Sequence, residues 1–200
     1  VVEPLLRAGR PTLLVVLDGM SAAVAVELAD ELSQHWVEYD PIAAGGPARR
    51  RGVVAALPTL TAVSRTSLFA GTLREGNQET ERQIFAQGRW GKHAHIFHKG
   101  PSRGAAGEVL APELVQAIAD PQQFVAVVPN TVDESLTYGR EGDEAGWQIG
   151  DIAVLRSLLD LARSAGRAVI ITSDHGHVLD RGAQQVRVAD AASARHRVGG

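Results

Sequence analysis

Short runs of apolar residues, many of them β-branched, alternate along this chain with longer stretches in which apolar positions recur every three or four residues. Uninterrupted apolar runs are typical of strands buried on both faces of a parallel sheet, and the longer period is typical of amphipathic helices. The runs predict five strands, at Thr12–Leu17, Val53–Leu57, His93–Phe97, Phe124–Val128 and Ala168–Thr172.

The longer-period stretches predict four helices between these strands. Ser21 stands where a side-chain oxygen caps a helix N-terminus, and Gly71 or Gly76 stands where a glycine ends a helix. Because strands alternate with helices, we expect an α/β fold with a mostly parallel sheet sandwiched by helices, built as a single domain over residues 1–200. The predicted helices are the one capped by Ser21 and running through Gln34, then Thr61–Leu73, Pro112–Ile118 and Asp151–Ser164.

Composition narrows the class of protein. The 200 residues are 44% hydrophobic, enough for one core, and a formal net charge of −3 gives no global field that would mark a nucleic-acid or membrane binder. There are no cysteines, so any metal must use histidine and carboxylate ligands. No apolar run approaches the roughly 18 residues that span a bilayer, and the start lacks a signal-peptide pattern, so we expect a cytoplasmic protein with no membrane partner. The start at Val1 and the end at Gly200 leave open that the chain is a piece of a longer one, with further ligands beyond either end.

Polar residues that could bind a metal or take part in catalysis follow the predicted strands. Ligands of parallel α/β sheets lie beyond the carboxyl ends of the strands, so these residues should gather at one edge. Taken singly, an Asp-Gly after a strand is usually a turn, and a threonine after a proline is usually a helix cap. The residues are Asp18, Thr61, Asp133, Asp174 and His175.

Asp174 and His175 are the strongest of these candidates, because two adjacent ionisable groups directly follow a buried strand and precede Gly176. A satisfied turn aspartate beside a surface histidine is the simpler interpretation. However, a carboxylate next to an imidazole is also a common way to hold zinc or a similar divalent ion. Thr61 gains meaning beside such an ion, because coordination to a dication favours the alkoxide that attacks phosphorus.

Three motifs together resemble the alkaline phosphatase superfamily, and its nucleotide pyrophosphatase/phosphodiesterase branch most. They are the Leu17–Met20 phrase, the Leu57–Gly71 segment and the Thr172–His177 turn. Within the superfamily the chain is most similar to the PglZ domain of the phage-resistance systems called BREX, to which the Asn130–Glu134 phrase is also similar. The resemblance runs from Pro11 to Leu179, so it covers most of the chain.

The resemblance implies that Asp18, Asp174 and His175 bind one divalent metal. The metal is expected to be zinc, with manganese or magnesium as alternatives. Thr61 would be the metal-bound nucleophile that forms a covalent phospho-enzyme. Ser64 stands where the phosphodiesterase branch often has an asparagine that donates to a substrate oxygen.

The family's ligand set for a second metal is less complete in this sequence. Asp133 matches the carboxylate ligand of that metal, but Thr137 stands where the phosphodiesterase branch has a histidine. His196 is the candidate for the family's final histidine ligand, and His177 is another possible ligand. A one-metal site and a two-metal site with altered ligands therefore both stay open.

The resemblance implies a metal-dependent phosphodiesterase or phosphatase with a threonine nucleophile, acting on phosphate-ester or nucleotide substrates in phage defence. The sulfatase branch uses a modified cysteine or serine, so sulfate esters are less favoured in a chain without cysteine. The alternative is a weakly active or inactive structural or regulatory module of a BREX complex that keeps the fold and a metal. Other BREX proteins, including the DNA methyltransferase, are the implied partners.

Other polar groups have two interpretations each. Arg49–Arg51 could meet a nucleic-acid backbone, although such a run is more often a solvated surface, so direct nucleic-acid binding stays open. Arg65 lies one helical turn after Thr61 and either clamps a phosphate or forms an ion pair. His93, His95 and His98 surround a strand with no carboxylate in register, which favours edge-strand histidines over a metal site.

Overall fold

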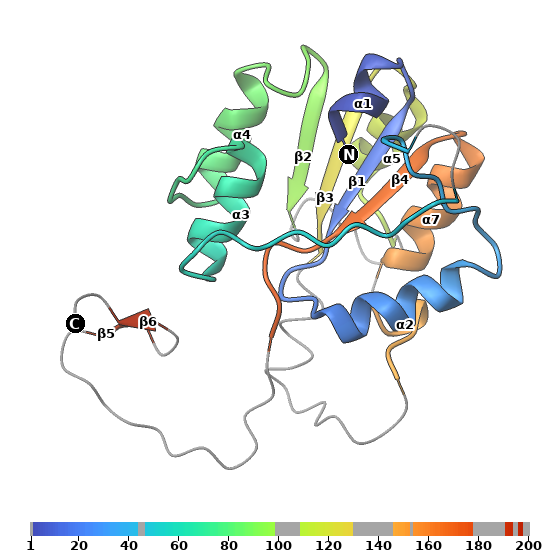
Figure 1. The fold of residues 1–200 in the computed structure, drawn as a ribbon. Coiled ribbons are helices and arrows are strands. Elements are labelled where there is room, and N and C mark those ends of the chain that lie inside the picture. Colours follow the sequence, from blue (N-terminus) through green and yellow to red (C-terminus); the bar gives the residue numbers. More distant parts are fainter. Residues whose placement is uncertain are drawn as a thin grey trace.

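Four strands form one all-parallel sheet in the computed structural model, which describes residues 2–43, 47–98, 109–129, 146–152, 154–177, 191–193 and 196–197. The order across the sheet is β2-β3-β1-β4, with parallel pairing at each of the three junctions (Figure 1). Two further short strands, β5 (Ala191–Ser193) and β6 (His196–Arg197), pair antiparallel in a separate sheet. The strands of the main sheet are β1 (Thr12–Val16), β2 (Ala94–His98), β3 (Phe124–Val128) and β4 (Ala168–Thr172).

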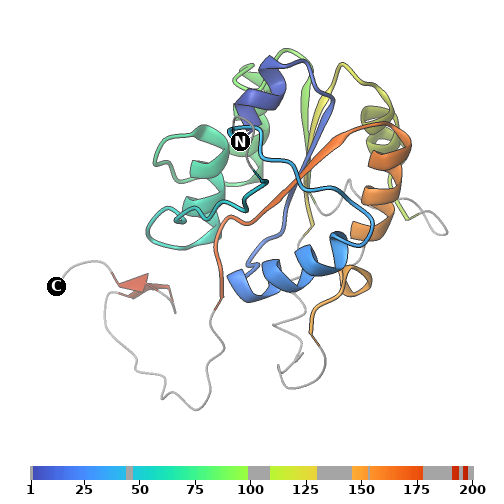
Figure 2. The same ribbon diagram turned by 45° about the vertical axis from the view of Figure 1, so that its right-hand side comes forward.

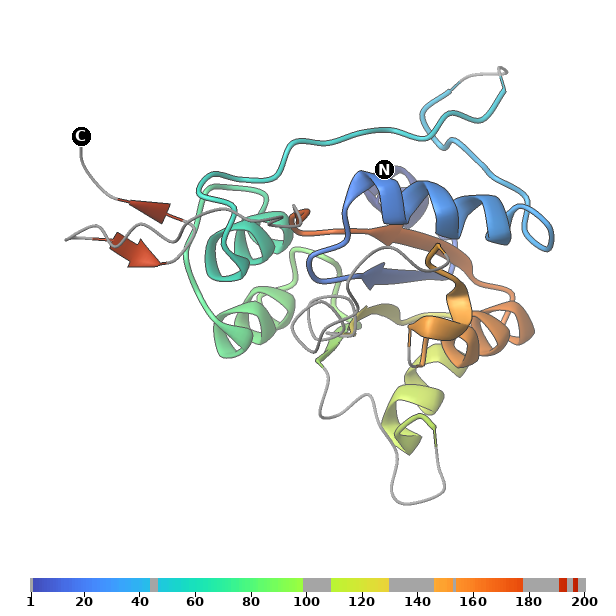
Figure 3. The ribbon, with the colours of Figure 1, turned by 90° about the horizontal axis from the view of Figure 1, so that it is seen from below.

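Helices cover both faces of this sheet, which gives three layers (Figures 2 and 3). One face packs against α2 (Ala22–Leu32), α5 (Pro112–Ala119), the short 3-10 helix η1 (Ile149–Asp151) and α7 (Leu155–Ser164). The other face packs against α1 (Val2–Arg7), α3 (Thr61–Ala70) and α4 (Gln78–Ala86). The predicted α/β architecture with helices on both faces is confirmed. That residues 1–200 form a single domain stays a prediction.

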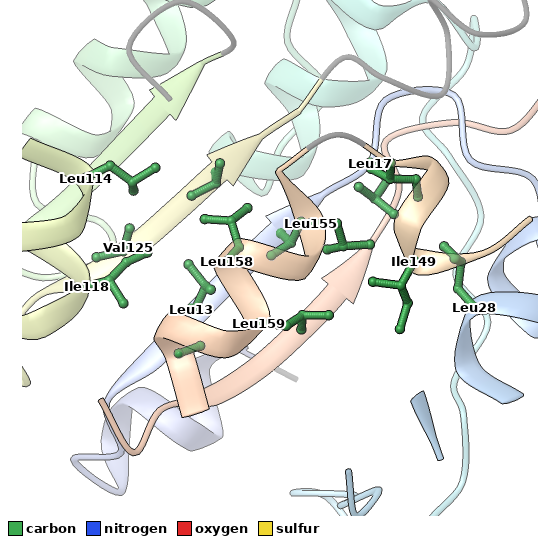
Figure 4. Packing of buried hydrophobic residues seen from close by; sticks show 14 of the residues in the cluster. Leu13, Leu17, Leu28, Leu114, Ile118, Val125, Ile149, Leu155, Leu158 and Leu159 are labelled. Atoms are coloured by element: carbon green, nitrogen blue, oxygen red, sulfur yellow. The ribbon is translucent and has the colours of Figure 1, made fainter. Parts of the chain in front are cut away.

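The core divides in two because neighbouring residues of a strand point to opposite faces. Leu13 and Val15 face α5 and α7, where leucines of α7 interlock with the sheet (Figure 4). Leu14 and Val16 face the opposite cluster around Phe69. All five residues of β1 are buried, as the uninterrupted apolar run predicts for a central strand. Burial of each large aliphatic side chain contributes about 1.5–3 kcal/mol, so β1 is anchored from both sides.

The prediction of a strand at Val53–Leu57 is wrong. The segment has no sheet partner, and Val53, Val54 and Leu57 are exposed at 75%, 94% and 71%. Its composition suits a strand, but it connects α2 to α3 along the surface, and Pro58 follows after a cis peptide bond. The other four predicted strands are confirmed, with β2 beginning one residue later than expected and β1 ending one residue earlier.

The predicted helices form with shifted ends. Ser21 caps α2 by accepting from the Val24 backbone N–H at 3.3 Å, and Gly71 ends α3 with a left-handed φ of 68°. The helix expected from Asp151 instead starts at Leu155, after the 3-10 turn. Among the described residues, two helices were not predicted from the sequence: α1 and α4.

Candidate metal centre

The carboxyl ends of β1 and β4 bring two of the predicted acidic residues together. These strands are parallel neighbours with Val16 opposite Thr172, so Asp18 and Asp174 each lie two residues past the end of adjacent strands. The ladder continues one step further, because the Leu17 N–H donates to the Thr172 carbonyl at 2.9 Å. The predicted gathering of Asp18 with Asp174 is therefore what the strand order produces.

Asp174 is held by backbone donors on one oxygen alone. Its Oδ1 accepts from the backbone N–H of Gly19 at 3.2 Å and of His175 at 2.9 Å. Gly19 has a φ of +76°, a conformation that favours glycine and turns its N–H toward the carboxylate. The other oxygen, Oδ2, is buried and has no hydrogen-bond partner among the described residues.

His175 presents its Nε2 to both carboxylates. Its Nδ1 lies 3.0 Å from the Gly176 carbonyl oxygen, an acceptor, so Nδ1 carries a hydrogen. Nε2 lies 3.4 Å from Asp18 Oδ1 and 3.8 Å from Asp174 Oδ2. A backbone acceptor on Nδ1 is a common way to orient a metal-binding imidazole, because it leaves Nε2 for the ion.

The three ionisable groups perturb one another strongly. Burial and the charge of Asp18 raise the pKa of Asp174 to about 6. The hydrogen bond to Asp18 raises the pKa of His175 to about 9, against the opposing effect of burial. For Asp18 itself, burial alone would raise the pKa, but the hydrogen bond with His175 and the charge of Arg65 outweigh it and hold the pKa below its usual range. Without a metal, an imidazolium therefore supplies the positive charge between the two carboxylates.

These residues fit a divalent ion. One ligand atom from each of Asp18, Asp174 and His175 lies within 4.8 Å of the others, and all three residues are buried. The partnerless Asp174 Oδ2 is a polar atom whose burial an ion would compensate. Two carboxylates with one imidazole form a hard, mixed donor set that suits zinc or manganese. The site can hold a metal, whose identity the donors alone do not decide.

Thr61 joins the cluster from α3, which covers the face of the sheet opposite α2. It is the first residue of α3, and its Oγ1 lies 3.0 Å from His175 Nε2 and 3.4 Å from Asp18 Oδ1. The first N–H groups of a helix have no partner within the helix and carry partial positive charge. A hydroxyl at this point is well placed beside an anionic ligand.

Ser64 lies one turn further along α3 and is engaged with the preceding loop. Its hydroxyl is buried and donates to the Ala56 carbonyl at 2.8 Å. A cleft of about 750 Å³ reaches from this loop to the Asp174 and His175 turn. The predicted contact of Ser64 with substrate stays a prediction.

The residues proposed for a second metal are not tested by the structure. Asp133 and Thr137 lie outside the described residues. His196 lies on β6, whose backbone alone is described. His177, the other possible ligand, has its Nδ1 2.7 Å from the Gly19 carbonyl oxygen, so it braces the turn after Asp18.

Sequence reasoning missed a buried chain of charges behind Asp18. Arg65 joins Asp18 to Glu81 of α4, and Glu81 contacts His98 at the end of β2. The strand that carries His95 and His98 lies at the edge of the sheet, as predicted, but the buried carboxylate partner of His98 in α4 was not predicted. The signal was that Glu81 shares a helical face with two buried apolar residues, Ile84 and Phe85.

The basic run at Arg49–Arg51 has partners within the chain. Arg50 pairs with Glu38 and with Asp30, and Arg51 forms two hydrogen bonds with Asp40 at 2.8 and 3.2 Å. These contacts tie the loop to α2 and to the segment that follows it. Two of the three arginines are thus occupied, which favours a structural role for the run over contact with a nucleic-acid backbone.

A parallel sheet between helices, with an Asp and an Asp-His pair just after its strands and Thr61 at the start of α3 beside them, is the arrangement that the resemblance to the alkaline phosphatase superfamily implies. A model of the BREX system PglZ alkaline phosphatase-like domain matches residues 1–197. The chain belongs to this PglZ family, so it is an alkaline phosphatase-like domain of BREX defence. Searches of curated proteins and of solved structures found no match. Among the residues that the structure describes, no helix is long and apolar enough to cross a membrane.

Proposed function

We propose that this domain is a divalent-metal-dependent phosphoric ester hydrolase with Thr61 as its nucleophile, acting on phosphodiester or phosphomonoester bonds. The observation that supports it most is the position of Thr61 Oγ1, within 3.4 Å of two of the three predicted metal ligands and at the start of a helix. The family contributes the expectation of phosphoesterase chemistry, since the matching domain is alkaline phosphatase-like.

In this proposal Asp18, Asp174 and His175 hold the metal. When bound, a divalent ion lowers the pKa of a coordinated hydroxyl and neutralises charge that develops on phosphoryl oxygens. Thr61 Oγ1 gives up its proton to solvent and attacks phosphorus, and the ester P–O bond breaks so that its oxygen leaves with the bonding electrons and takes a proton from solvent. Water then attacks the phosphorus of the phospho-threonine, the Oγ1–P bond breaks, Oγ1 is protonated again and phosphate or its monoester is released. The N-terminus of α3 carries the partial positive charge of the helix dipole, which stabilises the transferred phosphoryl group.

His175 must lose a proton before it can bind a metal, because its pKa lies near 9 in the metal-free protein. The Gly176 carbonyl keeps the remaining hydrogen on Nδ1, so the ring does not need to turn when the ion enters. Asp174 Oδ1 keeps its two backbone donors, and Oδ2 is the oxygen left for the ion.

A second candidate function is a structural or regulatory module of the BREX complex that binds a metal but turns over little substrate. The observation in its favour is Thr137, which replaces the histidine that the phosphodiesterase branch carries in its second metal site. Belonging to a BREX system implies other BREX components as partners. The DNA methyltransferase as a direct partner, zinc as the metal and a cytoplasmic location are further parts of the proposal.

Hydrolysis of p-nitrophenyl phosphate and bis-p-nitrophenyl phosphate separates the two functions. We expect turnover with added zinc or manganese, a loss of at least about a hundredfold in Thr61→Ala, and partial recovery in Thr61→Ser, which keeps a hydroxyl. Thr59→Ala is the matched control, because Thr59 is exposed two residues away. Thr61→Ala as active as the wild type would contradict the nucleophile. No turnover with any metal, despite metal binding, would favour the regulatory module.

A further inference from the structure

Arg65 is buried at the centre of a chain of charged side chains that ends at the metal site. It is 5% exposed, and its Nη1 donates to Asp18 Oδ2 at 2.8 Å while its Nε donates to Glu81 Oε1 at 2.9 Å. Glu81 is fully buried, and its Oε2 lies 2.5 Å from His98 Nε2. The four side chains come from the turn after β1, from α3, from α4 and from the end of β2.

This arrangement occupies one oxygen of Asp18 and leaves the other. Oδ2 takes the guanidinium, so Oδ1 is the oxygen that faces Thr61 Oγ1 and His175 Nε2 at 3.4 Å each. A carboxylate without such a partner can rotate and offer either oxygen or both. The guanidinium is a planar fork whose donors point in set directions, so it fixes the carboxylate plane as well as its charge.

Glu81 holds Arg65 from behind. A single Arg65–Asp18 pair would neutralise Asp18 and weaken its attraction for a cation. Glu81 is a second carboxylate partner of Arg65, so the guanidinium charge is shared between two acids and does not act on Asp18 alone. The site thus retains attraction for a dication while one of its ligands is oriented by a cation.

Resting on the metal site of the proposed function, we propose that Arg65 is a positioning residue that presents Asp18 to the metal through Oδ1 alone, with Glu81 and His98 as its buried support. Arg65 as a phosphate clamp is less favoured, because its Nη1 and Nε are both engaged with carboxylates and the residue is buried. The geometry assigns it to the ligand and not to the substrate.

Metal affinity distinguishes positioning from charge. Arg65→Lys keeps the charge, but one ammonium cannot span both carboxylates with a fork. Arg65→Gln adds a net negative charge, which by charge alone would tighten cation binding. We expect both variants to bind zinc or manganese about 10–100-fold more weakly than the wild type, the range typical when a residue that orients a ligand is lost. Arg82→Lys and Arg82→Gln are the matched controls, because Arg82 is an exposed arginine of α4 paired with Glu79.

The metal dissociation constant is measured without substrate, by competition with a chromophoric chelator. Circular dichroism of each variant after removal of its metal by a chelator shows whether the variant is folded. Visible absorption of the cobalt-loaded protein reports the coordination geometry directly, and we expect it to change in Arg65→Lys and not in Arg82→Lys. If Arg65 had only a structural role, its replacement would lower the unfolding temperature. The metal dissociation constant and the cobalt spectrum of the folded variant would then stay unchanged.

The outcomes separate this proposal from the proposed function. A wild-type chain that binds no metal overturns both. If the wild type binds metal and a folded Arg65→Lys binds it within about twofold with the same cobalt spectrum, the positioning role alone is overturned. If the Arg65 variants do not fold, Glu81→Gln carries the test, because it keeps the shape of the support. We expect its affinity to fall about tenfold with an altered spectrum, and an unchanged spectrum and affinity would overturn the proposal.

Discussion

Asp174→Asn should make the metal-free protein more stable while abolishing its metal binding. The side chain of Asp174 is buried, and its pKa is raised from 3.8 to about 6 by burial and by the charge of Asp18. A carboxyl whose pKa is raised in the folded state is stabilising only while it is protonated. That contribution is complete below about pH 4 and is lost as the pH rises through about 6.

The magnitude follows from the shift. About two pKa units correspond to about 3 kcal/mol, so at pH 8 the ionised Asp174 destabilises the metal-free fold by that amount. Asparagine has the same shape, and its Oδ1 can keep the hydrogen bonds from the Gly19 and His175 backbone N–H groups. For a domain of 200 residues, 3 kcal/mol corresponds to roughly 6–12 °C in Tm.

Thermal unfolding in EDTA at pH 4 and pH 8 tests this reasoning. Asp174→Asn should unfold at a higher temperature than the wild type at pH 8, and the difference should vanish near pH 4. The control is Asp160→Asn, an exposed aspartate of α7, which should change stability by less than about 0.5 kcal/mol. If Asp174→Asn were less stable than the wild type at pH 8, or if the difference in unfolding temperature did not depend on pH, the claim that ionised Asp174 destabilises the metal-free fold would be refuted.

Two other predictions follow from the same structure. Because the pKa of His175 lies near 9 without metal, each bound ion should displace about one proton between pH 7 and 8.5, and the association constant should rise with pH up to about 9. Calorimetric titration in buffers of different ionisation enthalpy measures the proton count, and a value near zero would contradict the assignment. At the other end of the sheet, buried Arg167 donates to the backbone carbonyls of Ile118 and Thr12 at 2.6 and 3.0 Å. Arg167→Met should cost about 3 kcal/mol in urea unfolding and leave the metal dissociation constant unchanged. Arg10→Met, at an exposed arginine, should change little, and equal effects of the two would argue against a role for these bonds.

The sequence predicts the part of the fold that depends on regular hydrophobic patterns. The apolar runs at β1, β3 and β4 each form a strand of the parallel sheet. Asp18 and Asp174 lie close together because each is the second residue after one of two neighbouring strands, β1 and β4. This convergence was predictable because the carboxyl ends of parallel strands share one edge. The same kind of apolar run gives a wrong prediction at Val53–Leu57, because the local sequence does not distinguish an exposed connecting segment from a strand of the sheet.

The support behind Asp18 was not predictable from spacing. Arg65, Glu81 and His98 come from two helices and one strand, and each is an ordinary polar residue in its own segment. What joins them is the packing of α3 and α4 against the end of β2, which depends on apolar contacts such as Phe69 with Phe85 at a ring-centroid distance of 5.3 Å. A charged residue on the apolar face of α4 was the one local sign, and it does not identify its partner.

Anomalous diffraction from crystals grown with zinc or manganese tests the central claim most directly. The account predicts a peak at the metal's absorption edge within bonding distance of Asp18 Oδ1, Asp174 Oδ2 and His175 Nε2, and beside Thr61 Oγ1. The peak should be absent in Asp174→Asn. A metal-saturated crystal with no peak among these residues, or a peak that persists unchanged in the variant, would contradict the account.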